Sequence, residues 1–162
     1  MDDIRQGEIP KLVLSILICQ AAGIAGSFFT ASSLEGWYPT LIKPAFTPPG
    51  GLIGLVWIIL FTLMGLALFL VIREGTEKPE VKAALIIFAL QLVVNVLWSL
   101  AFFGLKSPLA GIVVILILWA LILLTIIRFL PISRAAALLM VPYILWVSFA
   151  AFLNISIWWL NL

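Results

Sequence analysis

Two stretches of the chain carry polar and aromatic side chains at helical spacing inside otherwise apolar runs. The first lies within residues 83–105 and holds five such side chains: Gln91, Asn95, Trp98, Ser99 and Phe102. Their spacing places them on one face of a helix, while the residues between them are mostly Leu and Val. An amide and an indole on one apolar face suit the binding of a flat, mostly apolar ligand that carries a few polar atoms.

The second stretch repeats this pattern within residues 135–160, where the face is formed by Tyr143, Trp146, Ala150, Asn154 and Ile157. Both faces should point into a helix bundle, because an unpaired amide in lipid is costly. An alternative role is hydrogen bonding between helices. We favour that role for Gln91 and Asn154, and ligand binding for Asn95, Trp98 and Trp146.

The chemistry that the sequence lacks is also informative. The chain has no His and a single Cys, Cys19, which lies in an apolar run and is expected to be a buried thiol. A zinc or iron site made by the protein and a His-ligated haem are therefore excluded, and we expect no cofactor and no metal. No Asp, Glu, Lys, Arg or His lies within the long apolar runs, which disfavours ion-coupled transport. The net charge of +2 is too small and scattered to predict nucleic-acid binding.

The composition predicts that membrane-spanning helices position these residues. Apolar residues make up 65% of the 162 residues and charged residues 10%, and the mean hydropathy is +1.30. Five uncharged runs are long enough to cross about 30 Å of hydrocarbon, and they cover approximately 12–29, 51–72, 83–105, 109–127 and 135–160. We therefore predict an all-α membrane protein with one domain, residues 1–162, in which five helices form an up-down bundle. Short connections should make sequential helices antiparallel neighbours.

The first connection, residues 30–50, is longer than the others. Residues 37–50 within it hold four prolines, three aromatic residues and one lysine. Proline disfavours a helix here, and the aromatic content is not typical of a flexible linker. The segment is therefore predicted to be a stiff aromatic lid at one end of the bundle.

The basic residues predict the orientation in the membrane. Seven lie on the side of the N-terminus: Arg5, Lys11, Arg73, Lys78, Lys82, Arg128 and Arg134. Only two, Lys43 and Lys106, lie on the other side. Short loops rich in Lys and Arg stay in the cytoplasm, so the N-terminus is predicted to be cytoplasmic, with the first loop and the C-terminus outside.

The same residues resemble a known family. In the first loop, Trp37-Tyr38, Lys43-Pro44, Phe46 and Pro48-Pro49-Gly50, followed by Trp57, are similar to the signature of the TspO/peripheral benzodiazepine receptor family. Its members are also called translocator proteins or tryptophan-rich sensory proteins. The stretches that begin at Asn95 and at Pro142 resemble the third and fifth helices of that family. The resemblance covers essentially the whole chain, with five spans in the same order.

The resemblance implies a five-helix protein of a prokaryotic cytoplasmic membrane, with a homodimer as the expected assembly and a pocket beneath the first loop. Members of the family bind porphyrins, especially protoporphyrin IX, together with isoquinoline carboxamides and benzodiazepines. The positions that would bind such a ligand are Tyr38, Pro48, Trp57, Phe61, Asn95, Trp98, Ser99, Phe102, Trp146, Ala150 and Leu153. Trp37 and Phe46 of the lid would close the site or touch the ligand. Some members bind cholesterol, but the motif proposed for it needs a basic residue after a tyrosine, and none follows Tyr143.

Three functions remain open from the sequence. The leading one is a membrane receptor or regulator that binds a porphyrin. The second is light- and oxygen-dependent degradation of protoporphyrin, for which the resemblance implicates Trp57 and Trp146. The residues supply no acid–base pair or nucleophile, so the excited porphyrin and oxygen would have to provide the chemistry. The third is a passive carrier of porphyrin or of another lipophilic molecule.

Overall fold

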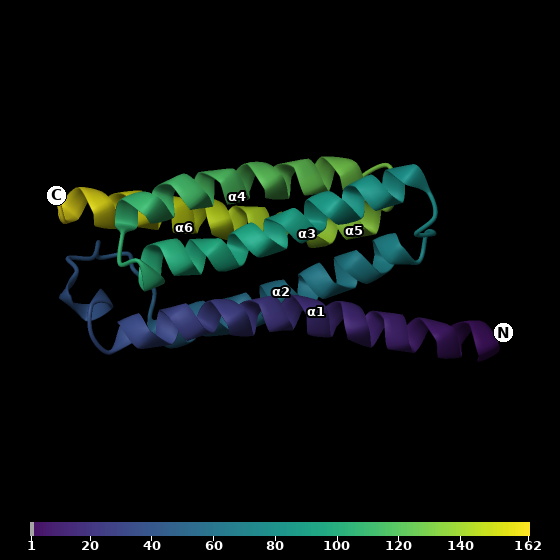
Figure 1. Cartoon of the computed structure of the whole chain (residues 1–162), viewed down its shortest axis with the longest axis horizontal. Helices are drawn as coiled ribbons and strands as arrows, with labels where there is room; N and C mark the ends of the chain where they lie inside the picture. Colours follow the sequence, from purple (N-terminus) through teal and green to yellow (C-terminus); the bar gives the residue numbers. More distant parts are fainter. Residues whose placement is uncertain (1) are drawn as a thin grey trace.

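The chain forms a bundle of helices in the computed structural model, which describes the backbone of residues 2–162 and the side chains of residues 7–162 (Figure 1). Within this part of the chain the elements are α1 (Asp2–Leu34), the 3-10 turn η1 (Tyr38–Thr40), α2 (Gly50–Ile72), α3 (Pro79–Ser99), the π-helical turn η2 (Leu100–Gly104), α4 (Pro108–Phe129), α5 (Arg134–Leu139) and α6 (Val141–Leu160). No strand occurs in the described residues.

Five segments are long and apolar enough to cross a membrane: Gly7–Leu34, Gly50–Ile72, Pro79–Gly104, Pro108–Phe129 and Arg134–Leu160. Large apolar side chains, among them Phe28, Ile86 and Leu145, are exposed on the outside of the bundle, as a lipid environment requires. The prediction of an all-α protein with five spans is thereby confirmed. Figure 1 shows the two termini at opposite ends of the bundle, in agreement with an odd number of spans.

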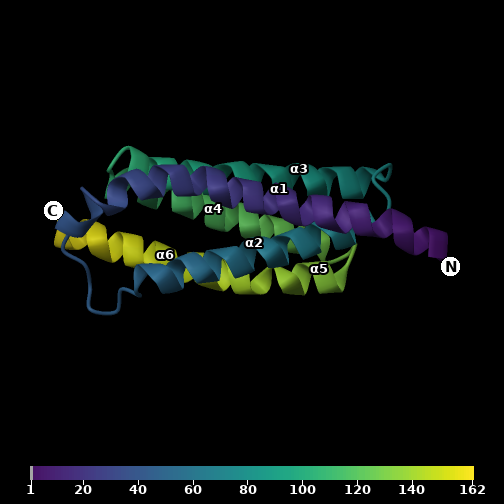
Figure 2. The ribbon, with the colours of Figure 1, turned by 90° about the horizontal axis from the view of Figure 1, so that it is seen from below.

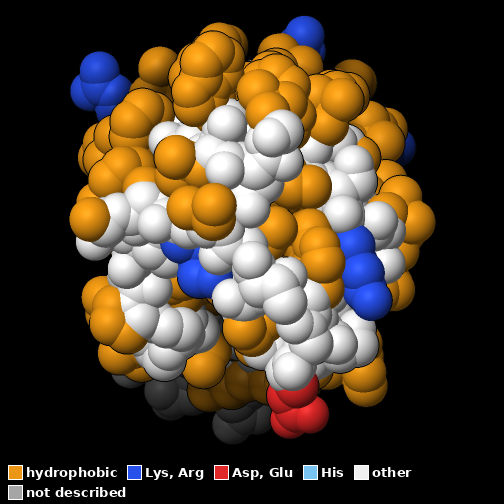
Figure 3. All heavy atoms as spheres, turned by 90° about the vertical axis from the view of Figure 1, so that its left-hand side faces the viewer, with side chains coloured by type: hydrophobic (Ala, Val, Ile, Leu, Met, Phe, Trp, Pro, Cys, Tyr) orange, Lys and Arg blue, Asp and Glu red, His pale blue; other side chains and the backbone are white. Residues whose placement is uncertain are grey.

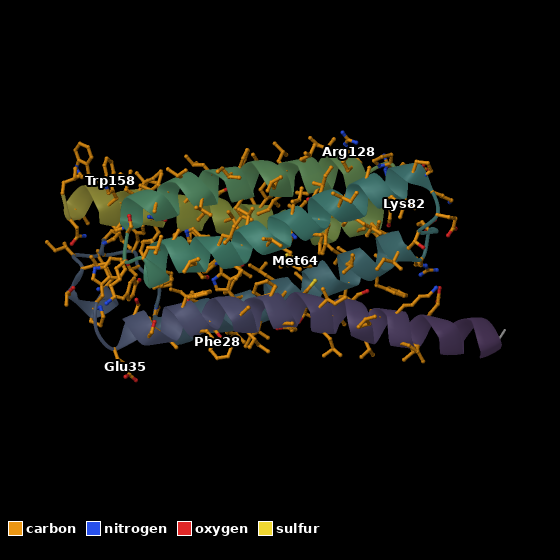
Figure 4. All side chains as sticks on the ribbon, viewed as in Figure 1. Phe28, Glu35, Met64, Lys82, Arg128 and Trp158 are labelled. Atoms are coloured by element: carbon orange, nitrogen blue, oxygen red, sulfur yellow. The ribbon has the colours of Figure 1, made fainter. Side chains whose placement is uncertain are left out.

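The two ends of the bundle carry different charged residues, and basic residues that the orientation argument groups together lie at the same end. Figure 4 shows Lys82 and Arg128 at the end where α1 begins, and Glu35 at the opposite end, where α1 meets the first loop. The side chain of Arg5, which was counted with the basic end, lies outside the described residues. Which end faces the cytoplasm stays a prediction.

Helix α1 is longer than the span 12–29 predicted for it, and the first loop is correspondingly shorter, residues 35–49. The difference arises from polar residues that lower the local hydropathy without ending the helix. The hydroxyl groups of Ser27, Thr30 and Ser32 donate hydrogen bonds to helix carbonyls three or four residues earlier, at 2.6, 3.3 and 3.0 Å. Hydroxyls bonded in this way are compatible with an apolar surrounding.

Sequential helices are not all neighbours, so that part of the prediction is wrong. Helix α1 packs against α2 and α3, α4 packs against α3 and α6, and α5 packs against α2, whereas α2 and α3 touch only slightly. From these contacts, the order around the bundle is α1, α2, α5 with α6, α4 and α3. Figure 2 shows α2 running alongside α5. The connection 73–78 joins α2 to α3 across the end of the bundle (Figure 1).

The fifth span is interrupted at Met140, where α5 ends and α6 begins. Pro142 occupies the first turn of α6, and a proline there lacks the N–H that would continue the hydrogen bonds of α5. The break lets α5 pack against α2 while α6 turns toward α4. As a result α2 and α6 hardly touch along the half of the bundle near the first loop.

The half of the bundle away from the first loop is densely packed, and we call it the closed half; it comprises residues 7–19, 64–72, 79–91, 115–129 and 134–140. A Cβ atom added to Gly65 would lie 2.5 Å from the Cα atom of Ile16, so the backbones of α1 and α2 touch there. The rings of Phe88 and Phe129 stack with centroids 5.7 Å apart. Such contacts bring backbone and rings of this half into direct contact.

The π-helical turn η2 ends the third span. Its backbone bond runs from the N–H of Leu105 to the carbonyl of Leu100 at 2.7 Å, five residues apart, so one more residue is accommodated than an α-turn would hold. The turn carries Phe102 and Phe103, whose rings lie 4.8 Å apart and both meet Tyr38 of the first loop. The extra residue thus presents two adjacent rings to the loop.

Candidate ligand-binding site

A cavity of about 780 Å³ lies in the half of the bundle near the first loop. Its walls come from α1, α2, α3, η2 and α6. The loop residues Tyr38, Lys43, Thr47 and Pro48 line the end of the cavity nearest the loop, and we call this end its mouth. We call this region the open half; it comprises residues 20–34, 50–61, 95–104 and 146–157 together with the loop 35–49. The volume is within the range of small-molecule sites, about 300–1,000 Å³.

The structure places all of the predicted ligand-binding residues in the cavity wall except Trp37 and Phe46. Those in the wall are Tyr38, Pro48, Trp57, Phe61, Asn95, Trp98, Ser99, Phe102, Trp146, Ala150 and Leu153. They come from four separate segments of the chain, which the bundle brings around one space. Whether a ligand occupies that space is a proposal taken up below.

One wall of the cavity is a continuous set of aromatic rings. Trp57 stacks on Phe61 with centroids 5.6 Å apart and meets Trp98 at 6.2 Å. Trp98 in turn stacks on Phe102 at 6.0 Å. Flat rings arranged in this way offer a broad apolar surface that favours offset stacking with another flat ring system.

Trp37 and Phe46 pack behind the cavity and hold the loop on the bundle. The ring of Trp37 meets Phe102 edge to face, with centroids 5.7 Å apart. Phe46 stacks on Phe152 of α6 at 5.3 Å and meets Phe149 at 6.4 Å. The loop is thus fixed by ring contacts on both sides of the cavity mouth.

Polar contacts fix the same loop at its middle. The side chain of Asn161 accepts a hydrogen bond from the backbone N–H of Ile42 at 3.0 Å and donates one to the carbonyl of Ile42 at 2.9 Å. Tyr38 is half-buried, and burial raises the pKa of its hydroxyl above the ordinary value, so the group stays protonated at neutral pH. It can therefore act as a hydrogen-bond donor at the mouth.

A buried hydrogen-bonded chain forms the floor of the cavity. The Asn95 amide donates to the hydroxyl of Tyr143 at 2.7 Å, and that hydroxyl donates to Oε1 of Gln91 at 3.0 Å. Gln91 and Tyr143 are fully buried, whereas Asn95 also lines the cavity. Asn95 thus belongs both to the packing of α3 on α6 and to the wall of the site.

Asn154 also joins helices. Its Oδ1 accepts from the indole N–H of Trp98 at 3.3 Å, and its amide donates to the carbonyl of Pro108 at 2.9 Å. The prediction that Gln91 and Asn154 serve as hydrogen-bond links between helices is confirmed. The bond from Asn154 also fixes the plane of the Trp98 indole at the cavity wall.

Trp146 differs from the other indoles of the bundle. Its Nε1 is buried and has no hydrogen-bond partner among the described residues. Trp119, by contrast, donates its indole N–H to the Ser148 hydroxyl at 2.8 Å. Trp146 separates the cavity from a shallower apolar groove between α2 and α6, whose lining also includes Phe149. An unpaired buried donor costs about 1–3 kcal/mol.

Several residues of the wall were not predicted from the sequence. Gly26 is one of them: a Cβ atom there would lie 3.0 Å from Oγ of Ser99, so this glycine permits α1 to approach α3. Ala22 and Gly26 are small residues four positions apart, a spacing that permits close approach of helices and is the sequence signal that could have found this contact. Gly54 and Lys43 also line the cavity. Lys43 is part of the loop signature, and its charge within an otherwise uncharged segment, residues 37–50, was the sequence feature that could have marked it as a site residue.

The donor set suits an apolar ligand. Among the described side chains there is no group of three or more His, Cys, Asp or Glu residues that could hold a metal ion. Cys19 is fully buried, as predicted. The site can therefore stack rings, exclude water and offer a few hydrogen bonds.

Comparison with known proteins agrees with this architecture. The family model of the TspO/MBR family matches residues 15–160. The chain is 48% identical to the tryptophan-rich protein TspO of Chlorobaculum tepidum over 95% of this chain and 98% of the relative. It is 46% identical to the tryptophan-rich protein TspO of Archaeoglobus fulgidus over 94% and 98% of the two chains. Protein CrtK of Rhodobacter capsulatus is 34% identical over 88% of each. With five apolar helices in this order and a match that spans nearly its whole length, the chain belongs to the TspO/MBR family.

Proposed function

We propose that this protein is a membrane receptor or regulator that binds a porphyrin, or a similar flat hydrophobic molecule, in the open half of the bundle. The single observation that carries the proposal is the cavity of about 780 Å³ with the aromatic wall of Trp57, Trp98 and Phe102. Burial of a large apolar ring system would supply most of the affinity, at about 25 cal/mol per Å² before the costs of association.

The loop 35–49 acts as the lid of this site in our proposal. It contributes Tyr38 and Pro48 to the mouth, and its own ring contacts hold it against η2 and α6. Asn95 and Ser99 are the polar groups of the wall that would orient the ligand in the cavity.

The test is a titration of the purified protein in detergent or nanodiscs with protoporphyrin IX, followed by tryptophan fluorescence. We expect saturable quenching together with a shift of the porphyrin Soret band. Trp98→Phe should weaken binding, because it removes the indole from the cavity wall and with it the bond to Asn154.

The matched control is Trp119→Phe, which also removes one hydrogen bond between an indole and α6 but lies outside the cavity. Its affinity for porphyrin should equal that of the wild type. Quenching that does not saturate, or an equal loss in both variants, would contradict a site in this cavity.

A further inference from the structure

The mouth of the cavity carries one charge. Lys43 is half-buried in the loop 35–49 and lines the cavity. Among the described residues of the cavity wall, it is the only one with a charged side chain. Figure 3, which views the bundle from the end with the loop, shows mostly apolar and uncharged atoms, with blue in a few places and one red acidic group at the lower edge.

The contacts of Lys43 hold the ammonium group in place but do not neutralise it. Its Nζ donates hydrogen bonds to the carbonyls of Tyr38 and Leu41, both at 2.9 Å, and lies 4.8 Å from the centroid of the Tyr38 ring. An ammonium group has three N–H donors. The third has no partner among the described residues and remains for a ligand.

No carboxylate of the described residues pairs with this cation. The salt bridge among the described residues joins Arg73, which follows α2, to Glu8 of α1 at 3.7 Å, and it lies at the other end of the bundle. Figure 4 shows Glu35, the acid beside the loop, pointing away from the bundle. The mouth is therefore positive, and a cleft with apolar walls focuses the field of such a charge on the space inside it.

We propose that Lys43 binds an acidic group of the ligand, so that the site selects flat apolar molecules that carry a carboxylate at one edge. This inference rests on the proposed function and deepens it. The apolar body would enter the cavity against Trp57 and Trp98, and the carboxylate would stay at the mouth beside Lys43, where water also reaches it. A carboxylate placed deeper would be buried without a cation, which is costly.

The test compares protoporphyrin IX with its dimethyl ester, which keeps the ring and lacks the acids. The measured quantity is the ratio of their affinities in the wild type and in Lys43→Gln, which keeps a side-chain donor and loses the charge. We expect this ratio, diacid over diester, to fall about 10-fold in the variant, because a charge-assisted bond is lost for the diacid alone. The two porphyrins partition differently into detergent, but this difference affects the affinity ratio of both proteins equally. It therefore cancels when the two ratios are compared.

Two further variants sharpen the test. Lys43→Arg should keep the ratio of the wild type, because it keeps the charge. Lys106→Met removes a positive charge at the same end of the bundle from a residue that does not line the cavity, and it should also leave the ratio unchanged.

The outcomes separate the possible roles of Lys43. If Lys43→Gln weakens both porphyrins equally, the lysine only fastens the loop, and the inference is overturned. A similar fall of the ratio in Lys106→Met would mean that general surface charge attracts the acid, which also overturns it. If neither porphyrin binds to the wild type, the proposed function itself fails, and this inference fails with it.

Discussion

The closed half and the open half of this bundle are built from the same spans, yet they are packed in opposite ways. In the closed half, Gly65 brings the backbone of α2 onto Ile16 of α1. Eleven residues earlier on α2, at Gly54, an added Cβ atom would meet nothing within 4 Å, although the residue lines the cavity. Two glycines on one helix thus serve contact in one half and space in the other.

The side chains follow the same division. The closed half is mostly aliphatic, with the stacked pair Phe88 and Phe129, and its indole (Trp119) and its amide (Gln91) lie outside the cavity wall, whereas three indoles and three amides line the cavity of the open half. The open half also leaves the Trp146 donor unpaired. Natural proteins accept such local costs where a site needs them. The comparison indicates that the closed half is a packed core, whereas the open half keeps the space in which we propose that a ligand binds.

The largest effect should come from placing a side chain where the backbones touch. Gly65→Ala is expected to lower the free energy of unfolding by about 3 kcal/mol, because the new Cβ atom would meet the backbone of Ile16. Unfolding in mixed micelles measures it. Gly54→Ala, the control on the same helix, should be neutral or stabilising, since alanine favours a helix over glycine. Equal losses in both variants would remove the distinction between the halves.

The hydroxyl that joins the halves should have the next largest effect. Tyr143→Phe leaves the buried partners Asn95 and Gln91 without their shared bond, which should cost about 2 kcal/mol. The same unfolding assay measures it. In Tyr38→Phe the lost hydroxyl has no hydrogen bond with any described residue, so stability should not change. An unaltered Tyr143→Phe protein would show that the polar chain of the floor contributes nothing.

A filled cavity should reduce binding while the fold is kept. Gly54→Phe places a ring at the cavity wall where there is room for it, and porphyrin affinity should fall about 10-fold, equivalent to about 1.4 kcal/mol. Gly51→Phe is the control, because Gly51 lies on the same helix, has open space around it and is not part of the wall. Fluorescence titration of both variants measures the difference. Binding that survives unchanged in Gly54→Phe would place the ligand elsewhere.

The smallest effect is expected at the loop fastening. Asn161→Ala removes both bonds to the backbone of Ile42, each of which contributes about 1 kcal/mol or less at an exposed site. Hydrogen exchange of the Ile42 amide should accelerate several-fold while global stability changes little. Ser156→Ala, which removes a bond within α6 alone, should leave the exchange of Ile42 as in the wild type. Unchanged exchange in Asn161→Ala would show that ring contacts alone hold the loop.

The sequence predicted the five spans and the aromatic faces well, because hydropathy and helical spacing are properties of each segment by itself. It also distinguished Gln91 and Asn154, which form hydrogen bonds between helices, from the residues predicted to bind a ligand. The order of the helices around the bundle could not be predicted in this way, since it depends on how the break at Pro142 directs α5 and α6. The length of α1 was underestimated because hydropathy does not register hydroxyls bonded to their own helix.

The candidate site divides along the same line. Spacing along α3 and α6 was sufficient to place Asn95, Trp98 and Trp146 on inward faces. The wall contributed by α1 was missed, because its glycines and hydroxyls carry no periodic apolar signal. Lys43 was counted for orientation and as part of the loop signature, but its place at the mouth depends on the path of the loop between two ring contacts.

The π-helical turn at residues 100–104 has a consequence for how the chain tolerates insertions and deletions. Such a turn holds one residue more than an α-turn, so removing one residue would close it to an ordinary α-turn. Phe102 and Phe103 lie within the turn, so the deletion would change which rings face Tyr38 while the membrane-spanning length stayed almost the same. A single codon lost here would therefore leave a protein that still inserts into the membrane but has a differently shaped mouth, so gaps at this position are informative when relatives with different ligands are compared.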